Sequence, residues 1–277
     1  MKPGCLFIVA TPIGNLQDIT LRALETLKSV DQVAAEDTRR ARRLLSEFGI
    51  TVQTSAYHEH NEARQTPVLI RQLKEGRNLA LISDAGTPLI SDPGYRLVIA
   101  AVGAGIRCIP IPGPCAAIAA LSVSGLATDR FFFEGFLPAR NKARLARLQA
   151  LAGVGVSLVV YESAHRILDC LKDVQMVYGA DHPVSVSREL TKKFETVLRG
   201  AVADVLASME RDKDQQRGEF VIVLDAVKPA SPGSGVSPAA QKTFQILCDE
   251  LPASQAARIT ARLTGESRKA IYDLNKT

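Results

Sequence analysis

Residues 79–88 read LALISDAGTP, in which four apolar residues are followed at once by a turn that contains glycine and proline. The apolar run is short and does not alternate with polar residues, which is typical of a strand that is buried on both faces. Beyond the turn we predict a helix from Tyr95 to Ala104. A buried strand, a turn and a helix in this order predict one unit of an α/β fold with a parallel sheet.

The same layout occurs twice more in the first half of the chain. Residues 6–10, LFIVA, lead into the turn Thr11–Asn15, and residues 108–111, CIPI, lead into a Pro-Gly-Pro turn before a helix that we predict at 115–122. The carboxyl ends of parallel strands lie at one edge of a sheet, where open α/β folds bind ligands. We therefore expect the three turns to gather there. Further elements are predicted at 21–27, 33–35 and 38–48.

Glycine and proline suit these turns to ligand binding. Glycine lets the backbone approach a ligand closely, and proline leaves carbonyl groups without a local partner. Such turns can recognise an adenine and an amino-acid moiety, although any single one is also found as a mere connection. No turn matches GxGxxG or GxxxxGK[ST], which argues against a dinucleotide dehydrogenase and a P-loop nucleotidase.

The domain organisation follows from the remaining pattern. We place a first α/β domain at 1–126 and a second, with a mixed sheet, at 127–227. The composition KPASPGSGVSP predicts a flexible linker at 228–238, and 239–277 predicts two or three short helices. In the second domain, strands are expected near 131 and at 156–161, 184–187, 195–198 and 220–224, and helices at 141–151, 167–177 and 201–210.

Composition narrows the class of protein. The 277 residues carry a net charge of +5, which fits either an ordinary enzyme or one with a polyanionic partner. Five scattered cysteines without a CxxC motif indicate reduced thiols. His58, Glu59 and His60 lack a clear fourth ligand, so we expect no metal. No apolar run is long enough for a signal sequence or a membrane span, so we expect a cytoplasmic protein.

Seven segments resemble the tetrapyrrole methylase superfamily, in the order of that family: VATPIGNLQDIT at 9–20, AAEDTRR at 34–40, LISDAGTPLISDPGY at 81–95, PIPGPCAA at 110–117, FEGFLPA at 133–139, YESAHRI at 161–167 and RELTKKFET at 188–196. They are most similar to its ribosomal RNA branch, which methylates a cytidine 2′-hydroxyl of the small-subunit (16S) rRNA. The resemblance implies a two-domain tetrapyrrole-methylase-like α/β fold, a homodimer, and 16S rRNA or the 30S ribosomal subunit as partner.

The resemblance also implies S-adenosyl-L-methionine as cofactor, bound in the cleft between the domains and held mainly by backbone groups. Its contacts are carried over by motif onto three turns and onto two positions of the second domain. The expected cofactor-binding residues are Pro12, Ile13, Gly14, Gly86, Thr87, Pro88, Ile90, Cys115, Ala116, Leu190 and Gly218.

Methyl transfer to a ribose hydroxyl needs an in-line arrangement and is helped by a base or a nearby cation. Polar side chains directly after predicted strands are the candidates. We favour Glu162, Glu189 and Lys192 as catalytic residues. Asp37 and His165 also follow predicted strands and are further candidates. Asp37 would equally serve as a helix cap, and His165 would equally be an ordinary surface or core histidine.

Basic residues cluster in three places that predict RNA contacts. Arg39 and Arg40 begin a helix together with Arg42 and Arg43, and Arg268 and Lys269 lie in the tail. Arg140, Arg144 and Arg147 share a helix face in a stretch, 138–160, that contains no acidic residue. This absence favours contact with phosphate, and the alternative is a solvated face. The tail pattern of helix, glycine turn and basic helix resembles a helix-turn-helix.

Two other functions compete with RNA methylation. A tetrapyrrole C-methyltransferase of the cobalamin or sirohaem pathway would share the fold and would also need a basic cleft for its polycarboxylate substrate. An RNA-binding assembly factor would have no affinity for S-adenosylmethionine.

Overall fold

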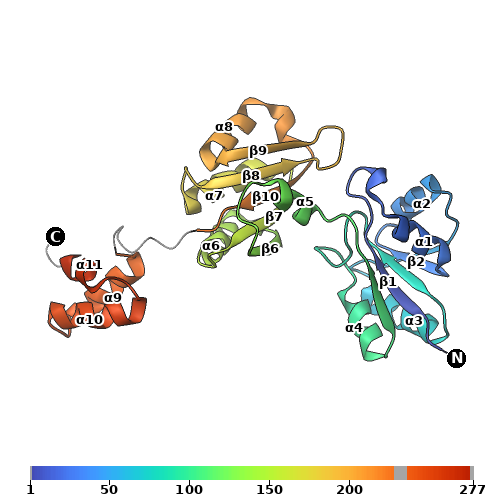
Figure 1. Ribbon diagram of the computed structural model, residues 1–277, viewed down its shortest axis with the longest axis horizontal. Coiled ribbons are helices and arrows are strands. Elements are labelled where there is room, and N and C mark those ends of the chain that lie inside the picture. The colour runs from blue at the N-terminus through green and yellow to red at the C-terminus, as the bar shows by residue number, and fades with distance from the viewer. Residues whose placement is uncertain (1, 228–235, 275–277) are drawn as a thin grey trace. The chain divides into compact units, whose positions relative to one another are not determined.

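The structure is a computed structural model that describes residues 2–227 and 236–274. The chain divides into two compact units, Met1–Ala226 and Val227–Thr277. The first unit contains two sheets and the second is helical (Figure 1). Most of the predicted linker at 228–238 lies outside the described residues. Within the described residues, no helix has the length and apolarity that crossing a membrane requires.

The first sheet is parallel, with the strand order β3-β2-β4-β1-β5. Every residue of β2 and β4 is buried, because helices cover both faces. α1 and α2 pack on one face through Leu27 and Leu45, and α3 and α4 pack on the other through Leu73 and Leu97. The strands are β1 (Cys5–Val9), β2 (Gln32–Ala35), β3 (Gln53–Ala56), β4 (Leu79–Ile82) and β5 (Arg107–Ile111). The helices are η1 (Leu16–Asp18), α1 (Leu21–Ser29), α2 (Thr38–Glu47), α3 (Glu62–Lys74) and α4 (Tyr95–Gly103).

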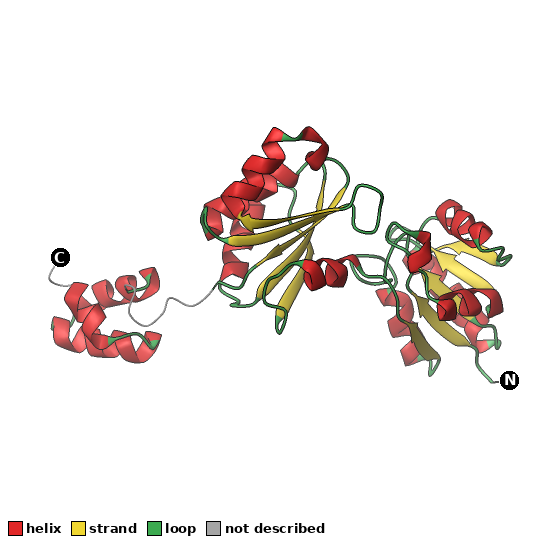
Figure 2. Cartoon of the chain, turned by 45° about the horizontal axis from the view of Figure 1, so that its top comes forward, coloured by secondary structure: helices red, strands yellow, loops and turns green. Residues whose placement is uncertain are grey.

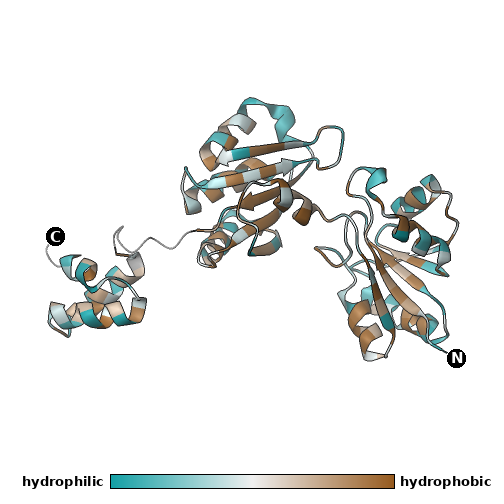
Figure 3. Cartoon of the chain, viewed as in Figure 1, coloured by the Kyte–Doolittle hydropathy of each residue, from teal (hydrophilic) through white to brown (hydrophobic). Residues whose placement is uncertain are grey.

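The second sheet has the order β6-β7-β10-β8-β9 and is mixed, as predicted. β6 and β7 run parallel, and the other neighbouring pairs are antiparallel. The apolar residues concentrate in the central strands of each sheet (Figure 3). The strands are β6 (Phe131–Phe136), β7 (Ser157–Ser163), β8 (Pro183–Arg188), β9 (Thr196–Ala201) and β10 (Glu219–Leu224). The helices are α6 (Asn141–Ala152), α7 (Ile167–Tyr178), α8 (Val202–Arg211) and η2 (Lys213–Gln216).

Helix α5 (Ala116–Val123) connects the two sheets. It follows β5 of the first sheet, yet its buried residues Ala117, Ala120 and Leu121 pack against Val159 and Val221 of the second. The opposite face of the second sheet is covered by α6, α7 and α8 (Figure 2). The third Gly/Pro turn, which precedes α5, therefore lies where the two sheets meet.

The second unit contains α9 (Pro238–Cys248), α10 (Ala253–Thr264) and α11 (Arg268–Asp273). The three helices share a core, to which each contributes buried residues: Phe244 from α9, Ala257 from α10 and Ile271 from α11. Gly265 ends α10 in the left-handed conformation, with φ of 74°. The helix, glycine turn and basic helix that the sequence predicts are therefore present.

Candidate functional site

The three Gly/Pro turns are joined by hydrogen bonds. Strands β4, β1 and β5 are neighbours, so the turns that follow them lie side by side, and the prediction that they gather is confirmed. Thr11 N donates to Gly86 O over 2.9 Å, and Gly86 N donates to Thr11 O over 3.0 Å. The Thr87 hydroxyl donates to the carbonyl of Pro114 over 2.9 Å. The result is a braced edge that carries backbone groups for a ligand.

The first turn also touches the loop after β8. The Asn15 N–H donates to the Thr191 hydroxyl over 3.1 Å. A Cβ atom at Gly14 would lie 2.4 Å from Cγ of Lys192 and 3.0 Å from the carbonyl oxygen of Leu190. Only glycine allows this approach. The turn and the loop thus bring residues of both sheets to one site.

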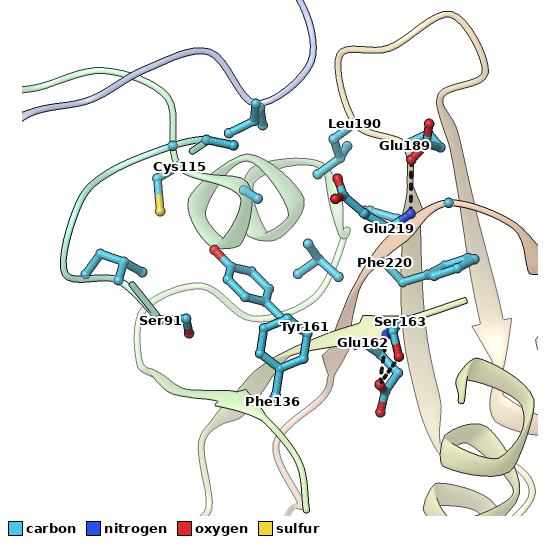
Figure 4. A pocket seen from close by; sticks show the side chains of 18 of the residues that line it. Ser91, Cys115, Phe136, Tyr161, Glu162, Ser163, Glu189, Leu190, Glu219 and Phe220 are labelled. Carbon is cyan, nitrogen blue, oxygen red and sulfur yellow. Dashed lines mark hydrogen bonds between the residues drawn. The ribbon is translucent and has the colours of Figure 1, made fainter. Parts of the chain in front are cut away.

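A cavity of about 330 Å³ lies at this meeting point. Figure 4 shows the Tyr161 ring directed toward Cys115, with Phe136 beneath it. Two loops that border the cavity contain the only non-glycine residues with positive φ in the described chain, Leu89, Ser91, Glu189 and Thr191. Such conformations cost energy and cluster at functional sites. The residues that line the cavity include Ile13, Gly86, Thr87, Ile90, Asp92, Cys115, Ala116, Tyr161, Glu162, Ser187, Glu189, Leu190, Lys192, Gly218 and Glu219.

Most of the predicted cofactor residues line this cavity. They are Ile13, Gly86, Thr87, Ile90, Cys115, Ala116, Leu190 and Gly218. Pro12 and Gly14 line a second cavity, and Pro88 is buried in the second turn outside both. The two cavities share Ile13, Ala85, Lys192 and Glu219 in their linings.

Glu162 lines the cavity, but its carboxylate is held within the fold, and its role as a catalytic base stays a prediction. Neighbouring residues of a strand point to opposite faces, so Glu162 points away from the side to which Tyr161 points (Figure 4). The Glu162 side chain is 0% exposed, and its Oε1 accepts bonds from Ser163 N at 2.8 Å and Arg166 Nε at 2.7 Å. Oε1 of Glu162 therefore braces the start of α7, while its Oε2 is buried without a hydrogen-bond partner among the described residues.

Glu189 and Lys192 do line the cavity, as an ion-paired group. Lys192 Nζ lies 2.8 Å from Glu189 Oε1 and 2.7 Å from Glu219 Oε2. Burial acts to lower the pKa of Lys192, but the two carboxylates outweigh it and raise that pKa. Burial acts to raise the pKa of Glu189, but bonds from Lys192 and Glu219 N outweigh it, and the pKa falls. Both groups stay charged at neutral pH, so Lys192 supplies a cation and not a base.

Three lining residues were not singled out in the sequence. The Tyr161 hydroxyl accepts a bond from Ala117 N over 3.2 Å at the start of α5, and burial raises the pKa of this phenol. Ser187 contributes a buried hydroxyl that has no hydrogen-bond partner among the described residues. Asp92 is half-buried beside Ser91. A signal for Asp92 exists in the sequence, because SDPG at 91–94 repeats the SDAG of the turn at 83–86.

The basic face predicted on α6 is not free, and this expectation was wrong. Arg144 is buried and pairs with Asp173 at 2.6 Å, where the two side chains are 4% and 6% exposed. Arg147 makes two bonds of 2.6 Å to Glu134. Of the three arginines predicted to bind phosphate, only Arg140 is exposed and has no acidic partner among the described residues.

The second cavity has a volume of about 480 Å³, and its lining contains three basic residues, Arg40, Arg43 and Lys192, and three acidic ones, Glu47, Asp84 and Glu219. Arg40 and Arg43 of α2 line it, whereas Arg39 pairs with Asp37, the N-cap of the helix. Arg40 pairs with Asp84 at 3.1 Å but stays 70% exposed. Arg43 is exposed and forms no ion pair within the described residues. Arg268 and Lys269 of α11 are exposed in the other unit.

The first cavity fits S-adenosylmethionine. Its volume suits a ligand of that size. Gly86, at φ of 78°, forms a cradle in which a Cβ would lie 3.3 Å from Ile13 Cγ2. Backbone groups, the unpartnered Ser187 hydroxyl and aromatic rings suit an adenosine, and nearby carboxylates suit a sulfonium. No group of three or more His, Cys, Asp or Glu that would hold a metal occurs in the described part of the chain.

Two sheets that meet at a ligand cavity define a two-domain α/β class of enzyme. Comparison of the chain with models of known protein families shows which family it belongs to. The family model "Tetrapyrrole (Corrin/Porphyrin) Methylases" matches residues 5–206, and the model "RsmI C-terminal HTH domain" matches 234–274. The chain belongs to the tetrapyrrole methylase family.

A relative agrees with this assignment, and solved structures share the fold. The chain is 48% identical to a protein of Haemophilus influenzae named ribosomal RNA small subunit methyltransferase I, over 97% of this chain and 95% of that protein. A diphthine synthase structure aligns with a TM-score of 0.62 at 15% identity, over 80% of this chain and 90% of that one. The structure of a uroporphyrin-III C-methyltransferase from Thermus thermophilus, complexed with S-adenyl homocysteine, aligns with a TM-score of 0.57 at 18% identity, over 81% of this chain and 98% of that one. The protein is a methyltransferase, and S-adenosylmethionine is its cofactor.

Proposed function

We propose that this protein transfers a methyl group from S-adenosylmethionine to the 2′-hydroxyl of a cytidine in the decoding region of 16S rRNA. The observation that carries the proposal is the pair of adjoining cavities. One is built from backbone turns and suits the cofactor. The other presents Arg40 and Arg43, which suit a polyanion, alongside the acidic residues Glu47, Asp84 and Glu219. The relative from Haemophilus influenzae, named as an rRNA methyltransferase, supports RNA as that polyanion.

The second cavity is our choice for the entry of the RNA strand. Arg40 and Arg43 face it from α2, and Lys192 and Glu219 separate it from the first cavity. Arginine guanidinium groups pair well with phosphate oxygens. A strand held at Arg43 would bring a ribose across the first turn toward the methyl group, because Ile13 borders both cavities.

The C-terminal unit is our second RNA contact. Arg268 and Lys269 are exposed on α11, directly after the glycine turn at Gly265. In a helix-turn-helix the second helix contacts nucleic acid, and the match to a C-terminal HTH model supports this use. We expect the assembled 30S subunit or free 16S rRNA to be the substrate, and the cytoplasm to be the compartment.

We also propose a homodimer. Helix α4 exposes Tyr95, Ile99 and Val102, which are 69%, 53% and 64% exposed. Their spacing of four and three residues places them on one helix face. An apolar stripe of this kind marks an interaction surface, and a second copy of the chain is the occupant we expect.

One experiment decides between RNA methylation and its competitors. Purified protein is incubated with methyl-labelled S-adenosylmethionine and either 30S subunits, free 16S rRNA or uroporphyrinogen, and labelled RNA is digested to nucleosides. We expect label in 2′-O-methylcytidine. Label in the tetrapyrrole alone would establish the C-methyltransferase instead. No affinity for S-adenosylmethionine in calorimetry would favour the RNA-binding assembly factor.

A further inference from the structure

The loop that carries Asp92 is held in one conformation at the wall of the first cavity. Leu89 and Ser91 have φ of 72° and 65°, and Gly94 has φ of 135°. The Gly94 N–H donates to Glu62 Oε1 over 2.8 Å, and a Cβ at Gly94 would lie 2.7 Å from Leu81 Cδ2. Held from both sides, the loop fixes the position of the Asp92 carboxylate among the lining residues.

The other acids at the cavity are occupied. Glu189 and Glu219 both pair with Lys192, and Glu162 turns its carboxylate toward Arg166. None of the chain's four histidines lines the cavity. Among the described residues, no Lys, Arg or His side chain lies within ion-pair distance of Asp92. Asp92 is therefore the lining carboxylate that forms no ion pair among the described residues, whereas Glu162 is paired through Oε1 and only its Oε2 lacks a partner.

The groups that face Asp92 are also acidic. Burial raises the pKa of Asp92 to about 6, with smaller contributions from the Glu36 and Asp84 charges and an opposing bond from the Ser83 hydroxyl. Burial and the Asp84 charge likewise raise the pKa of Glu36, although the charges of Arg40 and His58 act to lower it. The charge of Asp92 also adds to the effect of burial in raising the pKa of the Tyr161 phenol, which lines the same cavity. A carboxylate of this basicity is still ionised at neutral pH and is a better proton acceptor than an ordinary Asp.

We propose that Asp92 is the general base that takes the proton of the ribose 2′-hydroxyl, an inference that rests on the proposed function. As the hydroxyl oxygen forms its bond to the methyl carbon, the carbon–sulfur bond breaks and its electron pair stays on sulfur. The O–H proton passes to a carboxylate oxygen of Asp92 and then to water. Lys192 remains protonated beside the cavity and stays paired with the Glu189 and Glu219 carboxylates. S-adenosylmethionine supplies only the methyl group.

The test compares wild type with Asp92→Asn and Asp92→Glu. Single-turnover methyl transfer to 30S subunits is measured as a function of pH, and affinities for S-adenosylmethionine and RNA are measured separately. The wild-type rate should rise to a plateau through about pH 6, and Asp92→Asn should lose about 100-fold or more of the rate. Both affinities should stay within about twofold. Asp92→Glu should recover part of the rate, because it restores the acceptor.

A cofactor-free readout accompanies the rates. In carboxyl-carbon NMR of the unliganded protein, one resonance absent from Asp92→Asn should titrate near pH 6. Asp204→Asn is the control, since Asp204 is exposed on α8 and lines neither cavity. An active Asp92→Asn enzyme, or a loss explained wholly by weaker binding, would overturn the role of Asp92. A wild-type protein that leaves the RNA unmethylated would overturn the proposed function itself, and the inference with it.

Discussion

Thr11 and Gly86 exchange two backbone hydrogen bonds, of 2.9 and 3.0 Å, across the ends of β1 and β4. The pairing is an isolated antiparallel bridge beyond the two parallel strands, and it couples the first turn to the second. Since the Thr87 hydroxyl also bonds to the Pro114 carbonyl, the three turns form one braced surface. A change in any turn should therefore be felt at the cofactor.

Gly86→Val tests this surface. Gly86 has φ of 78°, and a Cβ there would meet Ile13 Cγ2 at 3.3 Å. We expect the affinity for S-adenosylmethionine to fall about tenfold or more, which corresponds to about 1.4 kcal/mol. The backbone strain should cost about 1–3 kcal/mol of stability. Calorimetric titration and thermal unfolding measure the two effects.

Gly49→Val is the matched control for that variant. Gly49 also has a positive φ, of 63°, but nothing lies within 4 Å of a Cβ built there. It should suffer similar backbone strain and keep its full affinity for the cofactor. Equal loss of affinity in both variants would mean that strain, and not the cradle at Gly86, governs binding.

Arg43→Ala tests the path of the RNA. If Arg43 neutralises one phosphate, its removal should reduce the slope of log affinity against log salt by about 0.7 to 0.9, and S-adenosylmethionine binding should be unchanged. Arg71→Ala removes an equal charge from α3, which covers the opposite face of the first sheet. A salt slope that is the same in Arg43→Ala and wild type would remove Arg43 from the RNA contact.

Arg144→Ala should affect folding rather than RNA binding. It would leave Asp173 buried without its cation, and breaking a buried pair in this way costs about 3–5 kcal/mol. Urea unfolding measures the loss, and Arg140→Ala, an exposed change at the start of the same helix, should cost much less. A fully stable Arg144→Ala protein with a flattened salt slope would return Arg144 to the RNA surface.

The sequence predicts the ligand edge of the first sheet well, because unalternating strands followed by Gly/Pro turns have few alternative folds. It assigns no element to residues 51–78, where the structure has β3 and α3. β3 is a polar edge strand, QTSA, and α3 contains Pro67, so neither shows the usual pattern. The partners of Arg144 and Arg147 lie 29 and 13 residues away. Such pairs are formed by packing and are invisible to local charge counts.

The difference in stability between Asp92→Asn and wild type should depend on pH. Ionisation of Asp92 destabilises the folded protein, whereas ionisation of a paired carboxylate stabilises it. Folding raises the pKa of Asp92 from 3.8 to about 6, so the ionised form is disfavoured in the folded protein. This penalty is absent below the unfolded pKa and is fully present above the folded one. Asparagine never ionises, so the variant should match wild type near pH 3 and be more stable at pH 7, with a melting temperature higher by at least about 2 °C. Scanning calorimetry at both pH values, with Asp204→Asn as control, measures the difference. An unchanged difference between the two pH values would show that Asp92 is as well solvated in the folded chain as in the unfolded one.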